Sequence, residues 1–246
     1  MVKEDGGSSR GDTAWIRYGG DRVKEVGIGR LGLRHLQDSV PWRQVRSRHG
    51  QKHLPGTYWS STMGGFVIYE SRLELARLLL ADFDPEVVAI RAQPLWLRHG
   101  TRGRVRRHVP DFLLTLRDGS ARVVNVKLAE RLEDPKVAEA LAWPAEVFSG
   151  CGWGYEVWSG FERVVLENIR FLAGYRRPGT VDQRLVEQVW DAIEDGDELA
   201  IAELKLGKQG PVEDVRPAIL SLLWRGSLTT DLARPLSGRS VLSRCR

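Results

Sequence analysis

Hydrophobic and polar residues alternate in some stretches of the chain and recur at helical spacing in others. Residues 14–26 (AWIRYGGDRVKEV) alternate on both sides of a Gly-Gly pair, which predicts a β-hairpin. Residues 67–84 consist largely of helix-forming residues, and their apolar positions follow a helical spacing that stops before Pro85. We therefore expect a helix over residues 67–84, the strongest helical signal in the chain.

Shorter elements follow this helix and mix strands with helices. Apolar and β-branched runs predict strands, with Pro94 marking a bulge or a sheet edge, and the turn residues RDGS at 117–120 join two strands into a hairpin. Because the two kinds of element alternate along the chain, we predict an α/β domain with a small mixed central sheet flanked by helices. The predicted strands are 87–100, 104–116, 121–130 and 154–160, and the predicted helix is 134–153.

The character of the sequence changes after the Gly-, Pro- and Arg-containing stretch 171–180. Three short amphipathic helices and a possible two-stranded wing follow, which predicts a small helical, winged-helix-like C-terminal domain at 180–246. Before the helix, residues 30–61 are basic and interrupted by Gly and Pro, which predicts an irregular arm. The helices are expected at 181–197, 198–207 and 211–226 and the wing at 227–238, and the domains at 1–60 (basic arm and hairpin), 61–175 (core) and 180–246.

Charge and cysteine content limit the kinds of function that fit. The net charge is +5, and the first 60 residues hold 11 Lys and Arg against 6 Asp and Glu. This basic excess favours a phosphate-backbone partner, although an ordinary solvated surface fits it equally well. Two distant cysteines exclude a disulfide framework and a cysteine-ligated zinc site. Without an apolar span or signal peptide, we expect a cytoplasmic protein and no membrane partner.

The hairpin predicted over residues 104–130 carries charged residues among apolar ones. Asp111 lies in VPDFLL, where an unpaired buried carboxylate would be costly, and Lys127 ends the run VVNVK. Because the intervening turn makes the two strands antiparallel neighbours, we expect Asp111 and Lys127 to converge at the open end of the hairpin. A solvated Asp at a strand start and a simple salt bridge are the alternatives.

A third charged residue, Glu74, lies on the apolar stripe of the strong helix. Together with Pro110-Asp111 and Asn125-Val126-Lys127, it resembles the core of PD-(D/E)XK nucleases. The ordered set YESRLELARLLLADFDPEVVAIRAQP, HVPDFLL and VVNVK, over about residues 58–160, is similar to the TnsA-type endonuclease subunit of heteromeric transposases, especially its actinobacterial branch. This resemblance implies a restriction-endonuclease-like core followed by a helical, winged-helix-like C-terminal domain.

The resemblance also implies a chemistry. Glu74, Asp111 and Lys127 would be catalytic, and Mg²⁺, or Mn²⁺ in its place, would be held by Asp111, Asn125, the Val126 carbonyl and Glu74. The enzyme would cleave the 5′ ends of a mobile element, on the non-transferred strand. The sequence departs from the family pattern at Asn125, a neutral ligand where an acid is usual; Glu130 could compensate or could be a solvated helix-start residue.

Arginines near this hairpin predict contact with DNA. The basic run at 98–107, beside a nuclease site, suits a phosphate clamp, and the N-terminal arm would extend it. The predicted DNA-binding residues are Arg98, Arg102, Arg104, Arg106, Arg107, Arg46, Arg48 and Lys52. The resemblance further implies transposon ends as the DNA, an integrase-like transposase as partner subunit, and an AAA+ ATPase regulator docking on the net acidic C-terminal domain.

Two other functions fit the same residues. The chain could be a non-catalytic DNA-bound scaffold or a winged-helix regulator, in which Asn125 marks a degenerate nuclease core. It could also be a restriction or repair nuclease, because a shared core does not fix the substrate.

Overall fold

The computed structural model describes residues 12–43, 54–101, 104–207 and 212–245. Contacts within the chain divide it into two compact units. The first unit consists of 1–57, 67–74 and 89–159, and the second of 58–66, 75–88 and 160–246. The architecture is mixed α/β, in agreement with the predicted fold class. None of the helices in the described ranges is long and apolar enough to span a bilayer.

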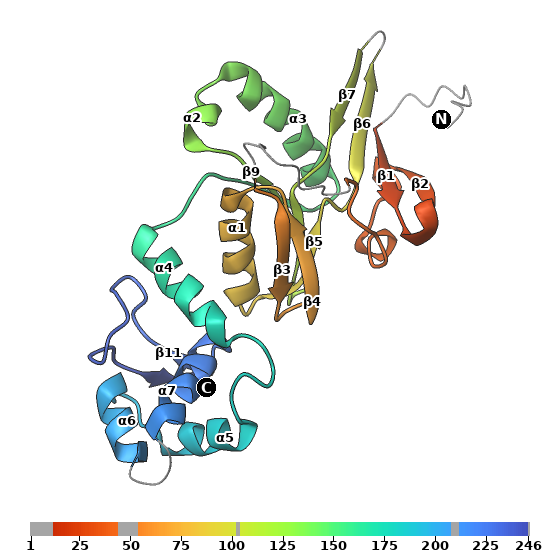
Figure 1. The fold of residues 1–246 in the computed structure, drawn as a ribbon. Coiled ribbons are helices and arrows are strands. Elements are labelled where there is room, and N and C mark those ends of the chain that lie inside the picture. The colour runs from red at the N-terminus through yellow and green to blue at the C-terminus, as the bar shows by residue number, and fades with distance from the viewer. Residues whose placement is uncertain (1–11, 44–53, 102–103, 208–211, 246) are drawn as a thin grey trace. The chain divides into compact units, whose positions relative to one another are not determined.

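One four-stranded sheet in the first unit has the order β2-β1-β6-β7, and its neighbouring strands are antiparallel. Figure 1 shows β6 and β7 running side by side as a narrow ribbon. The sheet's strands are β1 (Thr13–Arg17), β2 (Val23–Gly27), β6 (Trp96–Thr101) and β7 (Arg104–His108). The predicted hairpin over 14–26 is confirmed by the pairing of β1 with β2, which a 3-10 turn at Gly19–Asp21 connects. Two further 3-10 turns follow at Ile28–Arg30 and Leu33–His35.

The second four-stranded sheet, in the order β10-β9-β8-β5, is the predicted mixed sheet. Strands β8 and β9 are antiparallel, whereas β9 and β10 are parallel, with Val157 opposite Asn125. Both faces of this sheet are covered, since Phe112, Leu113 and Leu114 in succession are buried. Its strands are β5 (Val87–Ala92), β8 (Phe112–Leu116), β9 (Ala121–Val126) and β10 (Gly154–Trp158).

An apolar cluster is shared by the two sheets of the first unit. It includes Ile16, Leu97, Val123 and Phe148, so that strands of both sheets and helix α3 (Pro135–Gly150) contribute to it. Helix α3 begins where the sequence indicates, because Asp134 accepts a hydrogen bond from the Lys136 N–H (2.9 Å) and Pro135 occupies the first turn. A short helix, α2 (Ala129–Leu132), precedes it.

The second unit is built around a buried carboxylate and the C-terminal helices. Asp82, in α1 (Arg72–Phe83), accepts hydrogen bonds from the Tyr58 hydroxyl (2.7 Å), the Ser60 hydroxyl (2.6 Å) and the Thr62 N–H (2.8 Å). Its remaining elements are the helices α4 (Arg163–Leu172), α5 (Gln183–Ala192), α6 (Leu199–Gly207) and α7 (Val212–Trp224), a 3-10 turn at Ala173–Tyr175, and the strands β11 (Leu228–Thr229) and β12 (Ser243–Arg244).

Several predicted elements differ from those observed. Residues 67–69 belong to β4 (Gly65–Tyr69), which pairs with β3 (Gly56–Ser60), so the helix starts only at Arg72 and part of the predicted irregular arm is a strand. Two predicted strands are each split at a proline. Residues 87–100 divide at Pro94 into β5 and β6, and 104–116 divide at Pro110 into β7 and β8, in different sheets.

The three predicted C-terminal helices are confirmed, whereas the two-stranded pairing that follows them has other bounds than the predicted wing. Helices α5, α6 and α7 lie within the three predicted ranges. Strand β11, however, pairs with β12 at 243–244, beyond the predicted wing at 227–238. Helix α4 was not predicted, and the strand expected to run to residue 130 ends at Val126.

Candidate active site

Asp111 lies directly before β8, at the end of the sheet where β9 finishes. Its Oδ2 accepts a hydrogen bond from the Val126 N–H (2.6 Å), and its own N–H donates to the Val124 carbonyl (3.1 Å). These two bonds tie Asp111 to β9 through both side chain and main chain. The prediction that Asp111 converges with the end of the VVNVK run is therefore confirmed.

Asn125, Val126 and Lys127 end strand β9 next to Asp111. The Lys127 N–H donates to the Trp158 carbonyl (2.9 Å), which keeps the backbone in register with β10 up to that residue. Asn125 is almost fully buried, at 1% exposure. Lys127 lowers the pKa of Asp111, which places its ammonium within electrostatic range of that carboxylate.

Glu74 reaches the same site from the first turn of α1. Its Oε2 accepts from the Glu70 N–H (2.7 Å) and its Oε1 from the Ser71 hydroxyl (3.0 Å), while the Ser71 hydroxyl accepts from the Glu74 N–H (3.1 Å). Reciprocal bonds of this kind cap a helix N-terminus. Glu74 therefore has a structural role that the sequence interpretation did not foresee, in addition to any role in a site.

Burial changes the acidity of both carboxylates. It raises the pKa of Glu74 to about 7, with the negative charge of Asp111 adding to the effect and the hydrogen bond from Glu70 opposing it. Burial also raises the pKa of Asp111, against the lowering effects of the Val126 N–H, Lys127 and Arg43. Asp111 thus lies within electrostatic range of Lys127 and of Glu74, as a shared site requires.

Arg43 and Gln93 complete the surroundings of Asp111. Gln93 has a positive φ of 47°, which is strained for a residue other than glycine. In this conformation the Gln93 N–H donates to the Asp111 carbonyl (2.9 Å), and its side chain accepts from the Arg43 N–H (2.9 Å). The Arg43 guanidinium then donates to Glu70 (2.9 Å). Neither residue was predicted to belong to the site.

Half-buried His108 and buried Asn125 lie beside these charges. Burial lowers the pKa of His108 to about 4; the neighbouring Asn125 opposes this, and Lys127 and Arg43 add to it. The His108 Nε2 and both polar atoms of the Asn125 amide are buried without a hydrogen bond to any described residue. The two side chains are therefore neighbours whose geometry falls short of a hydrogen bond.

The donor set suits a hard divalent cation better than zinc. Among the described residues, no three His, Cys, Asp and Glu side chains gather in a way that could hold a metal ion. The two carboxylates of Asp111 and Glu74 would need the Asn125 amide oxygen, a backbone carbonyl and water to complete an octahedral set. The unpaired Asn125 amide fits such a role, because a buried amide without a partner is unfavourable. Glu130 is exposed on α2.

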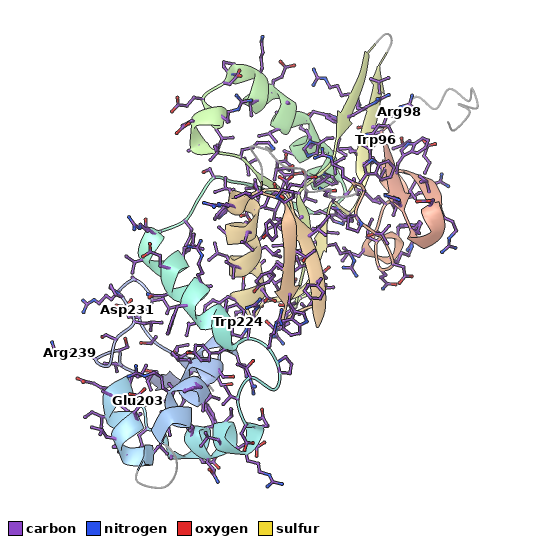
Figure 2. All side chains as sticks on the ribbon, in the orientation of Figure 1. Trp96, Arg98, Glu203, Trp224, Asp231 and Arg239 are labelled. Atoms are coloured by element: carbon purple, nitrogen blue, oxygen red, sulfur yellow. The ribbon has the colours of Figure 1, made fainter. Side chains whose placement is uncertain are left out.

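The described arginines of the predicted DNA-binding set lie on the β6–β7 ribbon. Arg98 on β6 is paired in register with Arg107 on β7, and Figure 2 shows Arg98 and Trp96 on the same strand. The Arg107 guanidinium lies over the Trp96 ring, 5.2 Å from its centroid, and Arg106 forms an exposed ion pair with Glu139 (2.8 Å). Arg102, Arg46, Arg48, Lys52 and the side chain of Arg104 fall outside the described residues.

Comparison with known proteins agrees with this geometry. Residues 84–160 match the family model described as the TnsA-like endonuclease N terminal. Asp111, Asn125 and Lys127 lie within the matched segment, and Glu74 precedes it. No curated protein matches the chain. Residues 84–160 are thus similar to a TnsA-like endonuclease domain, and this similarity supports a nuclease role in transposition.

Proposed function

We propose that this chain, whose residues 84–160 carry a TnsA-like endonuclease N-terminal domain, is the Mg²⁺-dependent DNA endonuclease subunit of a heteromeric transposase. In this proposal it acts in the cytoplasm and cleaves the 5′ ends of a mobile element, on the non-transferred strand. The observations that support the proposal most are the proximity of Asp111 to both Glu74 and Lys127 and the buried, unpaired amide of Asn125.

The chain holds its carboxylates in fixed orientations. The Val126 N–H fixes one oxygen of Asp111, and the Glu70 N–H together with the Ser71 hydroxyl fixes Glu74. Preorganised groups of this kind need little rearrangement when a charged ligand arrives. Asp111, Glu74, the Asn125 amide oxygen and the Val126 carbonyl are the groups that would hold the cation.

Lys127 supplies the proton chemistry in this proposal. A bound Mg²⁺, or Mn²⁺ in its place, would activate a water and offset the charge of the scissile phosphate. Lys127 follows Val126 directly, so its Nζ can orient the attacking water by a hydrogen bond or take a proton from it. Phosphodiester hydrolysis would leave a 5′-phosphate and a 3′-hydroxyl.

The ribbon arginines would position the DNA backbone. Arg98, Arg106 and Arg107 provide positive charge on β6 and β7, in the same unit as the site. Contacts of arginine to phosphate fix the register of a protein on DNA without reading its sequence. We propose that Arg102, Arg104, Arg46, Arg48 and Lys52 extend this surface.

The partners follow from the division of labour in such a transposase. An integrase-like subunit would cut and join the 3′ ends, and an AAA+ ATPase regulator would dock on the C-terminal helices. Residues 181–246 carry 9 Lys and Arg against 11 Asp and Glu, which suits a protein partner better than a DNA backbone.

A non-catalytic scaffold is the second candidate function. Asn125 replaces an acidic ligand, and the hydrogen bonds of Glu74 at the start of α1 are explained by helix capping alone. In a scaffold, the domain would keep its fold and its DNA-binding surface but hydrolyse nothing. A restriction or repair nuclease would share the chemistry and differ in its substrate.

A plasmid-nicking assay separates these functions. We expect the full chain, with Mg²⁺ or Mn²⁺ at low salt, to convert supercoiled plasmid to nicked circles. The Asp111→Ala and Lys127→Ala variants should each lose activity by about 100-fold or more, because each removes a group that acts on the metal or the water. Asp118→Ala is the matched control, since Asp118 is exposed at the turn between β8 and β9.

The outcome for the variants decides between catalysis and scaffolding. If the wild type, Asp111→Ala and Lys127→Ala nicked the plasmid equally, the activity would come from a contaminating nuclease. The non-catalytic scaffold would then be the better description of the function. Nicking retained by Asp118→Ala and lost by both site variants supports the proposed function. The 5′-phosphate of the product, detected by ligation, distinguishes hydrolysis of this polarity from the reverse.

A further inference from the structure

His108, which is half-buried, and Asn125, which is buried, carry polar atoms that make no hydrogen bond to any described residue. His108 Nε2, Asn125 Oδ1 and Asn125 Nδ2 are all buried and lack a hydrogen-bond partner among the described residues. Leaving one such group unpaired costs about 1–3 kcal/mol, so adjacent unpaired groups call for an explanation beyond packing.

The two side chains come from different sheets and meet beside the proposed metal ligands. His108 ends β7, and Asn125 is the last residue but one of β9. Asn125 acts on the pKa of His108 as a hydrogen-bonding neighbour would, although the two are not aligned for a hydrogen bond. Lys127 and Arg43 are the charged groups that act on His108 in the same place.

An amide can serve a hard cation only through its oxygen. Asn125 Oδ1 is a suitable ligand for Mg²⁺, whereas Nδ2 is a hydrogen-bond donor that repels a cation. If the oxygen faces the metal, Nδ2 needs an acceptor elsewhere. Lys127 and Arg43 carry donors only, so neither can accept this bond.

Neutral histidine supplies the missing acceptor. A neutral imidazole carries its single proton on one of the two ring nitrogens, and the other nitrogen accepts a hydrogen bond. With its proton on Nδ1, the ring presents a lone pair at Nε2, the atom that is buried and unpaired. Outer residues that fix the orientation of a metal ligand act in this way in many metal sites.

We propose that His108 is a positioning residue that accepts a hydrogen bond from Asn125 Nδ2 and thereby turns Asn125 Oδ1 toward the metal. This inference rests on the proposed function, because it assumes a cation held between Asp111 and Asn125. The hydrogen bond to His108 would fix which end of the Asn125 amide faces the metal. A carboxylate at this position has two equivalent oxygens and would not need to be oriented in this way.

The test is Mn²⁺ binding by calorimetry to the full chain without DNA, in two backgrounds. His108→Gln and His108→Met are matched in length, but only Gln offers a strong acceptor near the position of Nε2. With Asn125 present, Met should weaken Mn²⁺ binding by about tenfold or more, and Gln by less than about threefold. The Asn125→Asp background has no amide N–H that residue 108 could accept from. In this background the His108→Met and His108→Gln variants should have Mn²⁺ affinities within about threefold of each other.

Each outcome is decisive. Equal binding by the Met and Gln variants with Asn125 present, or the same difference between them in both backgrounds, would overturn the positioning role. Failure of the wild type to bind Mn²⁺ would contradict the proposed function itself, and this inference with it. Thermal unfolding of each variant, followed by circular dichroism, shows whether a loss of binding reflects loss of the fold.

Discussion

Glu74 illustrates how one carboxylate can serve both the fold and the site. Its two oxygens accept hydrogen bonds from Glu70 and Ser71 at the start of α1, which by itself would explain its presence. Capping does not explain why the Glu74 carboxylate lies within electrostatic range of Asp111. The negative charge of Asp111 raises the pKa of Glu74. A cation between the two would remove that repulsion.

Metal binding should depend on pH through Glu74. Because burial raises its pKa to about 7, the metal-free carboxyl is mostly protonated near pH 6, and a metal has to displace that proton. We therefore expect Mn²⁺ affinity, measured by calorimetry, to rise up to about tenfold per pH unit between about pH 6 and 7 and to level off near pH 8. The Glu74→Gln variant should bind Mn²⁺ more weakly, and its affinity should depend less on pH. If the Mn²⁺ affinity of the wild type did not change over this pH range, the role of Glu74 would be contradicted.

The sequence predicts the polar residues of the site better than it predicts the residues that hold them in place. Asp111, Asn125 and Lys127 can be located because charges stand out in an apolar hairpin, and the turn at 117–120 fixes their convergence. Arg43 and Gln93 could not be located, since their contacts depend on a left-handed backbone at Gln93 that no local pattern indicates. Its position before Pro94 favours an extended backbone at Gln93, which is not the conformation that it adopts.

At the level of elements, prolines decide where the predicted strands break. Pro94 and Pro110 each separate two strands that belong to different sheets. The apolar periodicity alone predicts one continuous strand across each of these prolines. The break at Pro110 places Asp111 directly before β8, where its carboxylate accepts a hydrogen bond from the Val126 N–H. What looked like a charged residue within a strand is a residue at a junction between two sheets.

The β6–β7 ribbon should carry the salt-dependent part of DNA binding. Replacing Arg98, Arg106 and Arg107 together by Gln should weaken binding to duplex DNA and reduce the slope of log K against log salt by roughly 1 for each phosphate that the variant no longer neutralises. Arg239→Gln is the control, because Arg239 is exposed in the other unit. Mobility-shift titrations at several salt concentrations measure the slope; an unchanged slope in the triple variant would exclude the ribbon as the phosphate-binding surface.

At the level of the whole molecule, similarity to known proteins covers only part of the chain. The family match spans residues 84–160, within which most of the proposed site lies. Glu74 and the C-terminal helices fall outside it, so their roles rest on geometry and composition. The sequence predicts the mixed sheet and the three C-terminal helices, whereas the pairing of β11 with β12 joins residues too distant for a local pattern to reveal.

The central claim is that Glu74, Asp111 and Asn125 hold one divalent cation beside Lys127. Crystals of the full chain grown with Mn²⁺ test it directly, because anomalous scattering locates the metal without reference to activity. We expect a single strong peak about 2 Å from an Asp111 oxygen and from Asn125 Oδ1, with Lys127 Nζ nearby. A peak elsewhere, or none with Asp111 and Asn125 well ordered at saturating Mn²⁺, would contradict it.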